Sequence, residues 1–315
     1  MKYASIDIGT NTLRLLVADG LADGNIRPLA YRRAITRLGG RYSEGCIDKY
    51  AAERTFNAIL EFKKVMDEYR VEKTIAVATS VVRRAKNKDW FVSEVTKRTG
   101  IGVSVISGDE EGRLSLLGVM TVVGGEKDRL IMDIGGGSTE FILARGAVIS
   151  GIWSMEMGVV HLAENFLKSD PPADCEIERM DREIRAVIRN LKKTMKGSGI
   201  AVEEYSERNG AEIVGTAGTI TTLAAMDQDI TEYDRGRINN YILSIDRMRA
   251  IWNNLVRLTL KERERILTLE KGREDLIIPG SLIALAAMDS FGFSSMRVSD
   301  AGLLEGVILN ELRLT

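Results

Sequence analysis

A short segment that occurs twice constrains the fold of this chain more than any other feature. The sequence DIGTNTLRLLVADG, from Asp7 to Gly20, aligns without a gap with DIGGGSTEFILARG, from Asp133 to Gly146. The D-I-G triplet is identical in both copies, and Thr12 aligns with Ser138. Each copy has an apolar run, a turn rich in Gly and hydroxyl residues, and a second apolar run, which predicts a β-hairpin. The repeat therefore predicts two similar units that arose by duplication and face each other across a cleft.

Strand and helix patterns continue behind each hairpin, which predicts an α/β fold. We place the domain boundary near residue 122, at the glycine-containing linker VVGGEKD, which gives domains 1–122 and 123–315. We expect the C-terminal helix, at about 300–315, to pack back on the first domain. Further strands are expected at 26–35, 73–79, 103–107, 148–155 and 212–218, and helices at 48–69, from 108, and at 175–196, 245–255, 260–267 and 276–289.

Composition excludes several classes of function. The chain has 44 Lys and Arg against 45 Asp and Glu, so a net charge of −1 provides no general attraction for nucleic acid or a membrane surface. A single histidine, His161, nearly excludes histidine-rich zinc sites and Ser-His-Asp triads. Cys46 and Cys175 lack metal-ligand spacing, and the N-terminus resembles a strand rather than a secretion signal, so we expect a cytoplasmic protein.

The glycine turns are candidate phosphate-binding loops, because Gly allows close approach and several N–H and hydroxyl groups can be aimed at one phosphate. A single D-I-G-x-x-[ST] hairpin is more often an ordinary turn, but two copies at matching positions favour the phosphate interpretation. A third Gly/Thr loop precedes a helix expected from Thr221, and a plain strand-to-helix connection explains it equally well. The candidates are Asp7, Gly9, Thr10, Asn11, Thr12 and Arg14; Gly135, Gly136, Gly137, Ser138 and Thr139; and Gly215, Thr216, Gly218 and Thr219.

Two acidic residues in the segment VISGDEEGRL have different predicted roles. Ser107 lies three residues before Glu110, which is the spacing of a capping box, so Glu110 has a structural role at the start of a helix. Glu111 is left able to face a cleft, where a carboxylate could deprotonate water for attack on phosphorus. Acidic residues in a first helical turn are more often partners of the helix dipole.

Three further carboxylates, those of Asp7, Asp133 and Glu140, lie in apolar strands or beside the glycine turns, where an unpaired charge is costly. Coordination of Mg²⁺, with Mn²⁺ as an alternative ion, would compensate this cost. Arg14 and Glu140 occupy equivalent repeat positions with opposite charge, so the two copies have diverged in role. Arg83, expected at a helix start, could bind phosphate oxygens, although such residues are more often solvated.

Taken together, these segments resemble the exopolyphosphatase/guanosine pentaphosphate phosphohydrolase family, relatives of sugar kinases, Hsp70 and actin. The resemblance covers nearly the whole chain, in its short two-domain form, and implies a duplicated actin-like, ribonuclease H-like fold and a homodimer. It rests on SIDIGTNTLRLLV, ATSVVRRAKN, VISGDEEGRL, IMDIGGGSTEF, VGTAGTITTLAAM, EKGREDLIIPG and VSDAGLLEG.

The resemblance also implies roles for individual residues. Glu111 corresponds to the catalytic base, with Arg83, Asp133 and Glu140 completing the centre, and the three loops correspond to phosphate-contacting segments. Two positions depart from the family pattern, because His161 and Leu304 stand where arginines are frequent.

We therefore expect hydrolysis of the terminal phosphoryl group of inorganic polyphosphate by water that Glu111 activates, with Mg²⁺ near Asp7, Asp133 and Glu140. An Asp7 nucleophile is the alternative mechanism. The alternative functions are hydrolysis of guanosine pentaphosphate, an actin-fold kinase or ATPase, and a non-catalytic sensor of polyphosphate or alarmone. Neither nucleic acid nor a membrane is an expected partner.

Overall fold

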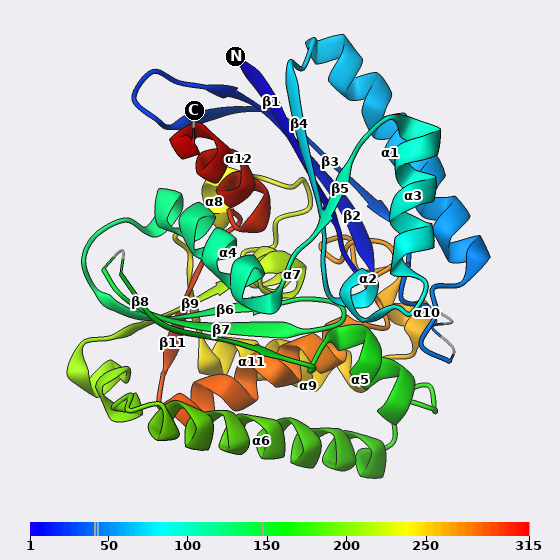
Figure 1. Cartoon of the computed structure of the whole chain (residues 1–315). Coiled ribbons are helices and arrows are strands. Elements are labelled where there is room, and N and C mark those ends of the chain that lie inside the picture. Colours follow the sequence, from blue (N-terminus) through cyan, green and yellow to red (C-terminus); the bar gives the residue numbers. More distant parts are fainter. Residues whose placement is uncertain (41, 43, 147, 315) are drawn as a thin grey trace. The chain divides into compact units, whose positions relative to one another are not determined.

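The chain forms two compact units, each built around one sheet (Figure 1). The computed structural model describes residues 1–40, 42, 44–146 and 148–314. The first unit comprises Met1–Gly118 together with Gly302–Thr315, and the second comprises Val119–Ala301. The division lies within a helix, slightly before the glycine linker at 122–128.

The sheet of the first unit has five strands in the order β3-β2-β1-β4-β5. The first three strands are antiparallel neighbours, and β1, β4 and β5 run parallel. A parallel connection needs a crossover, which the helices between the strands provide. The strands are β1 (Lys2–Ile8), β2 (Thr12–Gly20), β3 (Ile26–Ile35), β4 (Lys73–Ala78) and β5 (Val103–Val105).

The sheet of the second unit repeats this topology and adds one strand. Its order is β10-β11-β9-β6-β7-β8, in which β6, β7 and β8 are antiparallel neighbours and β6, β9 and β11 run parallel. Without β10, each strand has a counterpart in the first unit, beginning with β6 for β1. This confirms the predicted duplicated α/β fold of actin-like type. The strands are β6 (Asp128–Ile134), β7 (Thr139–Arg145), β8 (Val148–Met155), β9 (Glu212–Thr216), β10 (Ile242–Ser244) and β11 (Ser295–Val298).

Helices cover both faces of the first sheet, because its strands alternate apolar side chains between two cores. Ile6 of β1 and Leu15 of β2 pack in a cluster with Phe56 of α1. On the other face, Leu16 packs with Ile308 of α12. The helices are α1 (Lys49–Tyr69), α2 (Ser80–Arg84), α3 (Lys88–Thr99), α4 (Gly108–Val123) and α12 (Leu303–Leu314).

Two glycines allow α4 to approach the start of α12. A Cβ atom on Gly118 would lie 1.9 Å from the carbonyl oxygen of Gly302, and one on Gly306 would lie 1.8 Å from that of Leu114. Because no side chain fits at these distances, the backbones meet directly. This contact fixes the C-terminal helix on the first unit.

Helices of the second unit pack around a core that includes nearly all of α11. Two differ from the sequence-based expectation. The helix α7 begins at Ala217, with Thr216 as its N-cap residue, rather than at Thr221, and the helix expected at 260–267 ends at Arg263. The helices are α5 (Val159–Phe166), α6 (Asp174–Gly197), α7 (Ala217–Asp227), α8 (Arg235–Ile238), α9 (Ile245–Leu255), α10 (Leu260–Arg263) and α11 (Ile277–Phe291), with 3₁₀ turns η1 (Val202–Glu204) and η2 (Glu207–Asn209).

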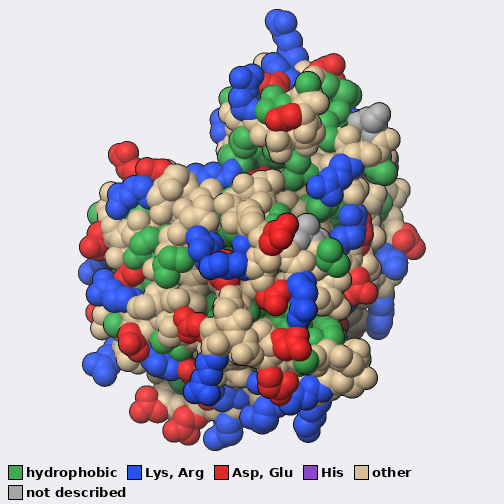
Figure 2. Space-filling model, turned by 90° about the vertical axis from the view of Figure 1, so that its left-hand side faces the viewer, with side chains coloured by type: hydrophobic (Ala, Val, Ile, Leu, Met, Phe, Trp, Pro, Cys, Tyr) green, Lys and Arg blue, Asp and Glu red, His purple; other side chains and the backbone are tan. Residues whose placement is uncertain are grey.

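The surface has no continuous field of one charge on the face that Figure 2 shows, where Lys and Arg side chains are interspersed with Asp and Glu side chains. This pattern agrees with the nearly balanced composition of the chain. Among the described helices, none combines the length and the apolar composition that crossing a bilayer requires.

Candidate functional site

The two D-I-G turns have the same backbone geometry. The N–H of Gly9 donates to the carbonyl oxygen of Thr12 at 3.2 Å, and that of Gly135 donates to the carbonyl oxygen of Ser138 at 2.9 Å. A Cβ atom on either glycine would lie 2.9 Å from that same oxygen. The turn therefore requires glycine at this position in both units, which explains why the glycine of the triplet is identical in both copies.

The first turn is held from behind by the segment that follows β3. The N–H groups of Thr36 and Arg37 donate to the carbonyl oxygen of Asn11 at 3.1 and 2.9 Å, and the N–H of Gly39 donates to that of Thr10 at 2.8 Å. These bonds satisfy the carbonyl groups of Thr10 and Asn11 and fix the backbone of the turn.

Several buried polar atoms around the first turn find no hydrogen-bond partner among the described residues. They are the Oδ1 atoms of Asp7 and Asn11 and the hydroxyl oxygens of Thr10 and Thr36. Their side chains are between 3% and 6% exposed. A buried polar atom without a partner costs about 1–3 kcal/mol, so such a group needs an external partner such as water, an ion or a ligand.

Asp7 and Arg14 form an ion pair across the first hairpin. They are directly opposite in the register of β1 and β2. The Nε and Nη2 atoms of Arg14 donate to Oδ2 of Asp7 at 2.8 and 2.6 Å. This leaves Oδ1 of Asp7 as the oxygen that faces away from the cation.

The second turn is supported by the segment that follows β8, which is the counterpart of β3. The N–H groups of Val159 and Val160, in the first turn of α5, donate to the carbonyl oxygens of Gly135 and Gly136 at 3.1 and 2.9 Å. The hydroxyl group of Thr139 donates to the carbonyl oxygen of Met157 at 2.5 Å. Thr139 therefore contributes to the support of the loop, and only its backbone remains for a phosphate.

Two carboxylates lie side by side across the second hairpin. Asp133 and Glu140 are opposite in the register of β6 and β7, at the positions of Asp7 and Arg14 in the first unit. Asp133 is 7% exposed and Glu140 is 1% exposed. The hydroxyl groups of Ser138 and Ser154 donate to Oε1 of Glu140 at 2.8 and 2.7 Å. These bonds stabilise the charged form of a carboxylate that would otherwise be costly to bury.

The third loop is shorter than the sequence suggested. Thr216 ends β9 opposite Asp133, and its hydroxyl group donates to the carbonyl oxygen of Ala301 at 3.1 Å. Ala217 has a φ of 68°, which is strained for a residue with a side chain. Gly218 and Thr219 lie in the first turn of α7, where backbone N–H groups have no partner within the helix. This strained start places the helix N-terminus beside the acidic pair.

Arg273 is a residue that sequence reasoning missed. A Cβ atom on Gly218 would lie 1.8 Å from Nη1 of Arg273, so the guanidinium lies directly against this glycine. The Nε atom of Arg273 donates to Glu270 at 2.6 Å. The signal was present, because Arg273 lies in the segment EKGREDLIIPG, but nothing in the local pattern distinguished it from a solvated arginine.

Arg83 and Glu111 form an ion pair in the first unit. The Nη1 atom of Arg83 donates to Oε2 of Glu111 at 2.9 Å and to the carbonyl oxygen of Ile106 at 3.0 Å. Glu111 is only 9% exposed. Arg83 lies in the last turn of α2 rather than at a helix start, because α2 is a single short helix that begins at Ser80. The structure thus brings the predicted base and the predicted arginine together.

Glu110, next to the predicted base, has a structural role. The hydroxyl group of Ser107 accepts from the N–H of Glu110 at 3.1 Å, as expected of a helix cap. The carboxylate of Glu110 pairs with Arg113, whose Nε and Nη2 atoms donate to it, both at 2.8 Å. These hydrogen bonds lower the pKa of Glu110 below its ordinary value. Glu110 and Glu111 therefore differ in partner.

The acidic pair of the second unit has the chemistry of a Mg²⁺ ligand set. Mg²⁺ in phosphate-processing proteins is typically held by one or two carboxylates, waters and phosphate oxygens. Asp133 and Glu140 supply two such carboxylates on adjacent strands, and Asp7 belongs to the other unit. No group of three or more His, Cys, Asp or Glu side chains with metal-site geometry occurs within the described part of the chain. Asp133 and Glu140 thus have the chemistry of two ligands of such an ion.

The two departures from the family pattern occupy different environments. His161, on α5, is exposed, and its Nε2 atom lies 2.9 Å from Nδ2 of Asn165. Leu304, on α12, is 6% exposed and packs with Tyr3 and Leu16 in the first unit. Leu304 therefore acts in packing at its position.

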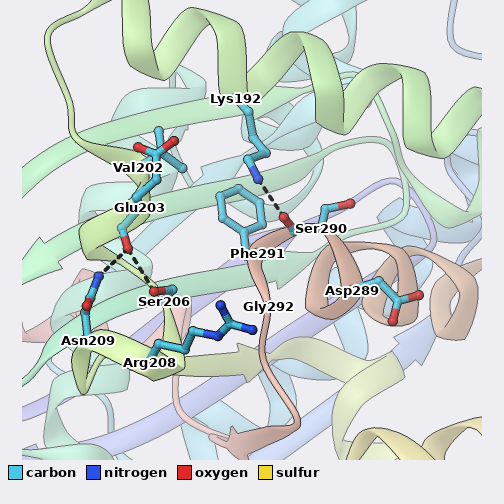
Figure 3. Close-up of a pocket in the computed structure, with 10 residues that line it drawn as sticks. All are labelled: Lys192, Val202, Glu203, Ser206, Arg208, Asn209, Asp289, Ser290, Phe291 and Gly292. Carbon is cyan, nitrogen blue, oxygen red and sulfur yellow. Dashed lines mark hydrogen bonds between the residues drawn. The ribbon is translucent and has the colours of Figure 1, made fainter.

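A separate cavity of about 470 Å³ lies in the second unit, away from the predicted site residues (Figure 3). Lys192 donates to the carbonyl oxygen of Ser290 at 2.6 Å and lies over the ring of Phe291, and the carbonyl oxygen of Glu203 accepts from Ser206 and Asn209. Glu203 also pairs with Lys196. Because these groups are already partnered, the cavity offers little for catalysis.

Comparisons with known proteins agree on one family. The sequence model described as the Ppx/GppA phosphatase family matches residues 17–315. Exopolyphosphatase 2 of Mycobacterium tuberculosis is 30% identical over 331 aligned positions, which cover 98% of each chain. The Ppx/GppA family member of Aquifex aeolicus has a TM-score of 0.79 and 32% identity, covering 100% of this chain and 98% of its own. An exopolyphosphatase of Cytophaga hutchinsonii has a TM-score of 0.89 and 28% identity, covering 100% and 99%.

Proposed function

Because the chain belongs to the Ppx/GppA phosphatase family, we propose that it is an exopolyphosphatase, which releases terminal orthophosphate from inorganic polyphosphate. The observation that best supports this proposal is the group of buried polar atoms around the first turn. Asp7, Thr10 and Asn11 each keep an oxygen without a partner among the described residues. The repeat in the sequence predicts a phosphate loop at this place, and a bound phosphate with its ion or waters would satisfy these atoms.

In the proposed reaction, backbone N–H groups of the first D-I-G turn bind the oxygens of the terminal phosphoryl group. Arg83 adds a guanidinium, which suits phosphate oxygens and the charge that develops on them. Positioning and charge stabilisation account for most of phosphoryl-transfer catalysis, so this arrangement needs no covalent intermediate.

Glu111 is the proposed general base. It takes a proton from a water molecule as the oxygen of that water forms a bond to the terminal phosphorus. The bond between this phosphorus and the bridging oxygen breaks, and the bridging oxygen keeps the electron pair. The ion pair with Arg83, at 2.9 Å, orients the Glu111 carboxylate for this role.

Mg²⁺, held by Asp133 and Glu140 of the second unit, would supply charge neutralisation for phosphate oxygens when bound. The hydroxyl groups of Ser138 and Ser154 donate to Oε1 of Glu140 and so orient this carboxylate. Their hydrogen bonds therefore serve the proposed site as well as the fold.

The test is orthophosphate release from medium-chain polyphosphate and from guanosine pentaphosphate in parallel, with and without Mg²⁺. Glu111→Gln should lower kcat by roughly two to four orders of magnitude, the usual range for a general base. Glu110→Gln is the matched control, because this neighbouring carboxylate pairs with Arg113 instead. A Glu111→Gln enzyme with a near-normal rate would overturn the base assignment.

The substrate comparison decides between related functions. Faster release from polyphosphate supports the proposal, and a preference for the nucleotide moves the assignment to guanosine pentaphosphate hydrolysis. Binding of either compound without turnover would indicate a sensor. We also propose a cytoplasmic homodimer on the basis of the family resemblance. Size-exclusion chromatography with light scattering measures the mass of the assembly and so tests the homodimer.

A further inference from the structure

The first unit contains a row of three charged residues that extends beyond the Asp7–Arg14 pair. Arg14 on β2 is opposite Asp7 on one side and opposite Arg33 of β3 on the other. Residues that are directly opposite on neighbouring strands point to the same face of a sheet. Asp7, Arg14 and Arg33, here called the charged row, therefore run from the strand of the first loop to the edge strand.

The charged row lies just beyond the area that α12 covers. The preceding row on this face consists of Ser5, Leu16 and Tyr31. Ser5 donates to the carbonyl oxygen of Leu304 at 2.8 Å, and the hydroxyl group of Tyr31 donates to Glu305 at 2.7 Å, so the start of α12 lies over these residues. The next residues along the strands remain accessible, because Arg33 is exposed and the Arg14 side chain is 30% exposed.

Two guanidinium groups on directly opposite positions repel each other, and such pairs are normally unfavourable in a sheet. Asp7 compensates Arg14 through two hydrogen bonds to one oxygen. The row as a whole still carries one carboxylate and two guanidinium groups. The planar guanidinium group of an exposed arginine matches the geometry of phosphate oxygens.

The equivalent row of the second unit shows that the strand pattern does not require this charge. It consists of Asp133, Glu140 and Ser154, in the same register on β6, β7 and β8. That row has two carboxylates and a hydroxyl group, and Ser154 donates to Glu140. The outer cation is thus a property of the first unit alone.

We propose that Arg33 binds the phosphate groups that follow the terminal one in a polyphosphate chain, and so sets the preference for chain length. The proposal rests on the function proposed above, in which the terminal group is bound at the first turn. Each further phosphate group carries negative charge, and a guanidinium one strand beyond Arg14 would contact only a chain long enough to reach it.

The experiment compares Arg33→Gln, Arg33→Lys and the matched control Arg32→Gln. Arg32 is adjacent on β3 and is also exposed, but it is opposite Leu15 and so points to the other face. We would measure kcat and KM on tripolyphosphate and on medium-chain polyphosphate. Kd for medium-chain polyphosphate would be measured in the Glu111→Gln background, which limits turnover.

We expect Arg33→Gln to raise KM and Kd for the medium chain about three- to tenfold, the range of one partly exposed charge contact. Its kcat, and its KM on tripolyphosphate, should stay within twofold of wild type. Arg33→Lys should recover most of the affinity because it restores the charge. Equal losses on both substrates, an equal loss in Arg32→Gln, or no change in Arg33→Gln would overturn the proposal.

The same data separate this inference from the proposed function. If wild type releases no orthophosphate from either substrate, the proposed function fails, while a Kd that still depends on Arg33 and on chain length supports the inference. If wild type does not bind polyphosphate, the inference fails. Thermal unfolding of each variant shows whether a change in Kd comes from lost folding. A lower melting temperature of Arg33→Gln together with a lower kcat would mean that the variant is misfolded, and this result would overturn the proposal.

Discussion

The two D-I-G turns share one backbone shape but differ in the side chains around it. Both close with a hydrogen bond from the glycine N–H, and both are supported by the segment after the third strand of the unit. Around the first turn, buried oxygens of Thr10 and Asn11 have no partner among the described residues, and the neighbouring carboxylate pairs with an arginine. Around the second turn, the hydroxyl group of Thr139 is hydrogen-bonded, and the carboxylates of Asp133 and Glu140 are opposite each other on neighbouring strands.

This difference shows how a duplicated fold can divide one task. The backbone of the turn is constrained by sterics, since any Cβ atom on Gly9 or Gly135 would meet a carbonyl oxygen, so it is the same in both units. The residue seven positions after the aspartate is not constrained in this way, because Arg14 and Glu140 extend from the sheet face. We infer that the first unit attracts phosphate and the second attracts the counterion.

Among changes that compare the two hairpins, the largest expected effect comes from neutralising the acidic pair. Glu140→Gln keeps an oxygen that can accept from Ser138 and Ser154 but removes the charge, so we expect kcat to fall about 100-fold and the Mg²⁺ concentration for half-maximal rate to rise. Orthophosphate release over a Mg²⁺ series measures both. Asp128→Asn, at the other end of β6, is the control. A normal Mg²⁺ dependence in Glu140→Gln would remove the metal role from this pair.

Breaking the ion pair of the first hairpin should affect stability. Arg14→Gln leaves the buried Asp7 without its cation, and we expect a loss of about 2 kcal/mol in the free energy of unfolding, less than for a fully buried pair because Arg14 is partly exposed. Urea denaturation measures this. The same method should show Glu140→Gln to be neutral or slightly stabilising, because it relieves a like-charge pair. If both variants lost equal stability, the two hairpins would not differ as described.

The shared glycines should give equal effects. Gly9→Ala and Gly135→Ala each place a Cβ atom 2.9 Å from a carbonyl oxygen, so each should destabilise the protein by about 1–2 kcal/mol. Gly24→Ala is the control, because a Cβ atom on Gly24 would meet no atom within 4 Å. The positive φ of Gly24 means that this variant reports the cost of backbone strain without a steric contact. A large difference between Gly9→Ala and Gly135→Ala, measured by urea denaturation, would show that the turns are not equivalent.

The hydroxyl groups of the two loops should behave in opposite ways. Thr139→Val removes the hydrogen bond to Met157, so we expect a loss of about 1 kcal/mol in stability with little change in KM. Thr10→Val removes a hydroxyl group without a partner among the described residues, so stability should hold while KM for polyphosphate rises a few-fold. Matching changes in KM for both variants would contradict the division of roles.

Much of the fold could be predicted because strong local patterns determine it. The helix from Asp48 to Tyr69 and the strand at 26–35 were predicted nearly to the residue, since Asp48 caps the helix and the apolar period is regular. The helix α5 was missed because it is short and follows directly after a strand. The start of α7 was placed too late, because Gly218 and the strained Ala217 do not resemble a helix N-terminus.

The site was predictable where it repeats and less so where it depends on tertiary contact. The two turns and the carboxylates were proposed from the duplication and the role of Glu111 from the family resemblance, and these roles stay predictions. The position of Arg273 against Gly218 brings together segments far apart in the chain, and no local pattern reports such a contact. The pairing of Arg83 with Glu111 is likewise a property of the folded unit.

A comparably small effect is expected for the support of the second turn. Glu176 of α6 accepts hydrogen bonds from Ser169, Lys168 and Ala173, in the connection between α5 and α6. The hydrogen bond from the Ser169 hydroxyl group is the main reason that the pKa of Glu176 is lowered to about 2. Since α5 supports the second turn with its N–H groups, this carboxylate links the turn to α6.

Because the pKa of Glu176 is lower in the folded protein, its contribution to stability is complete above the ordinary value near 4.5 and is lost as the pH falls towards about 2. We expect Glu176→Gln to cost about 1 kcal/mol at pH 7, the scale of hydrogen bonds to a charged group that water partly screens. The difference from wild type should shrink between pH 4.5 and pH 2, as followed by urea denaturation. Glu178→Gln, at a neighbouring position on α6, is the control. A difference that stays constant with pH would mean that the charge of Glu176 does not support the second turn.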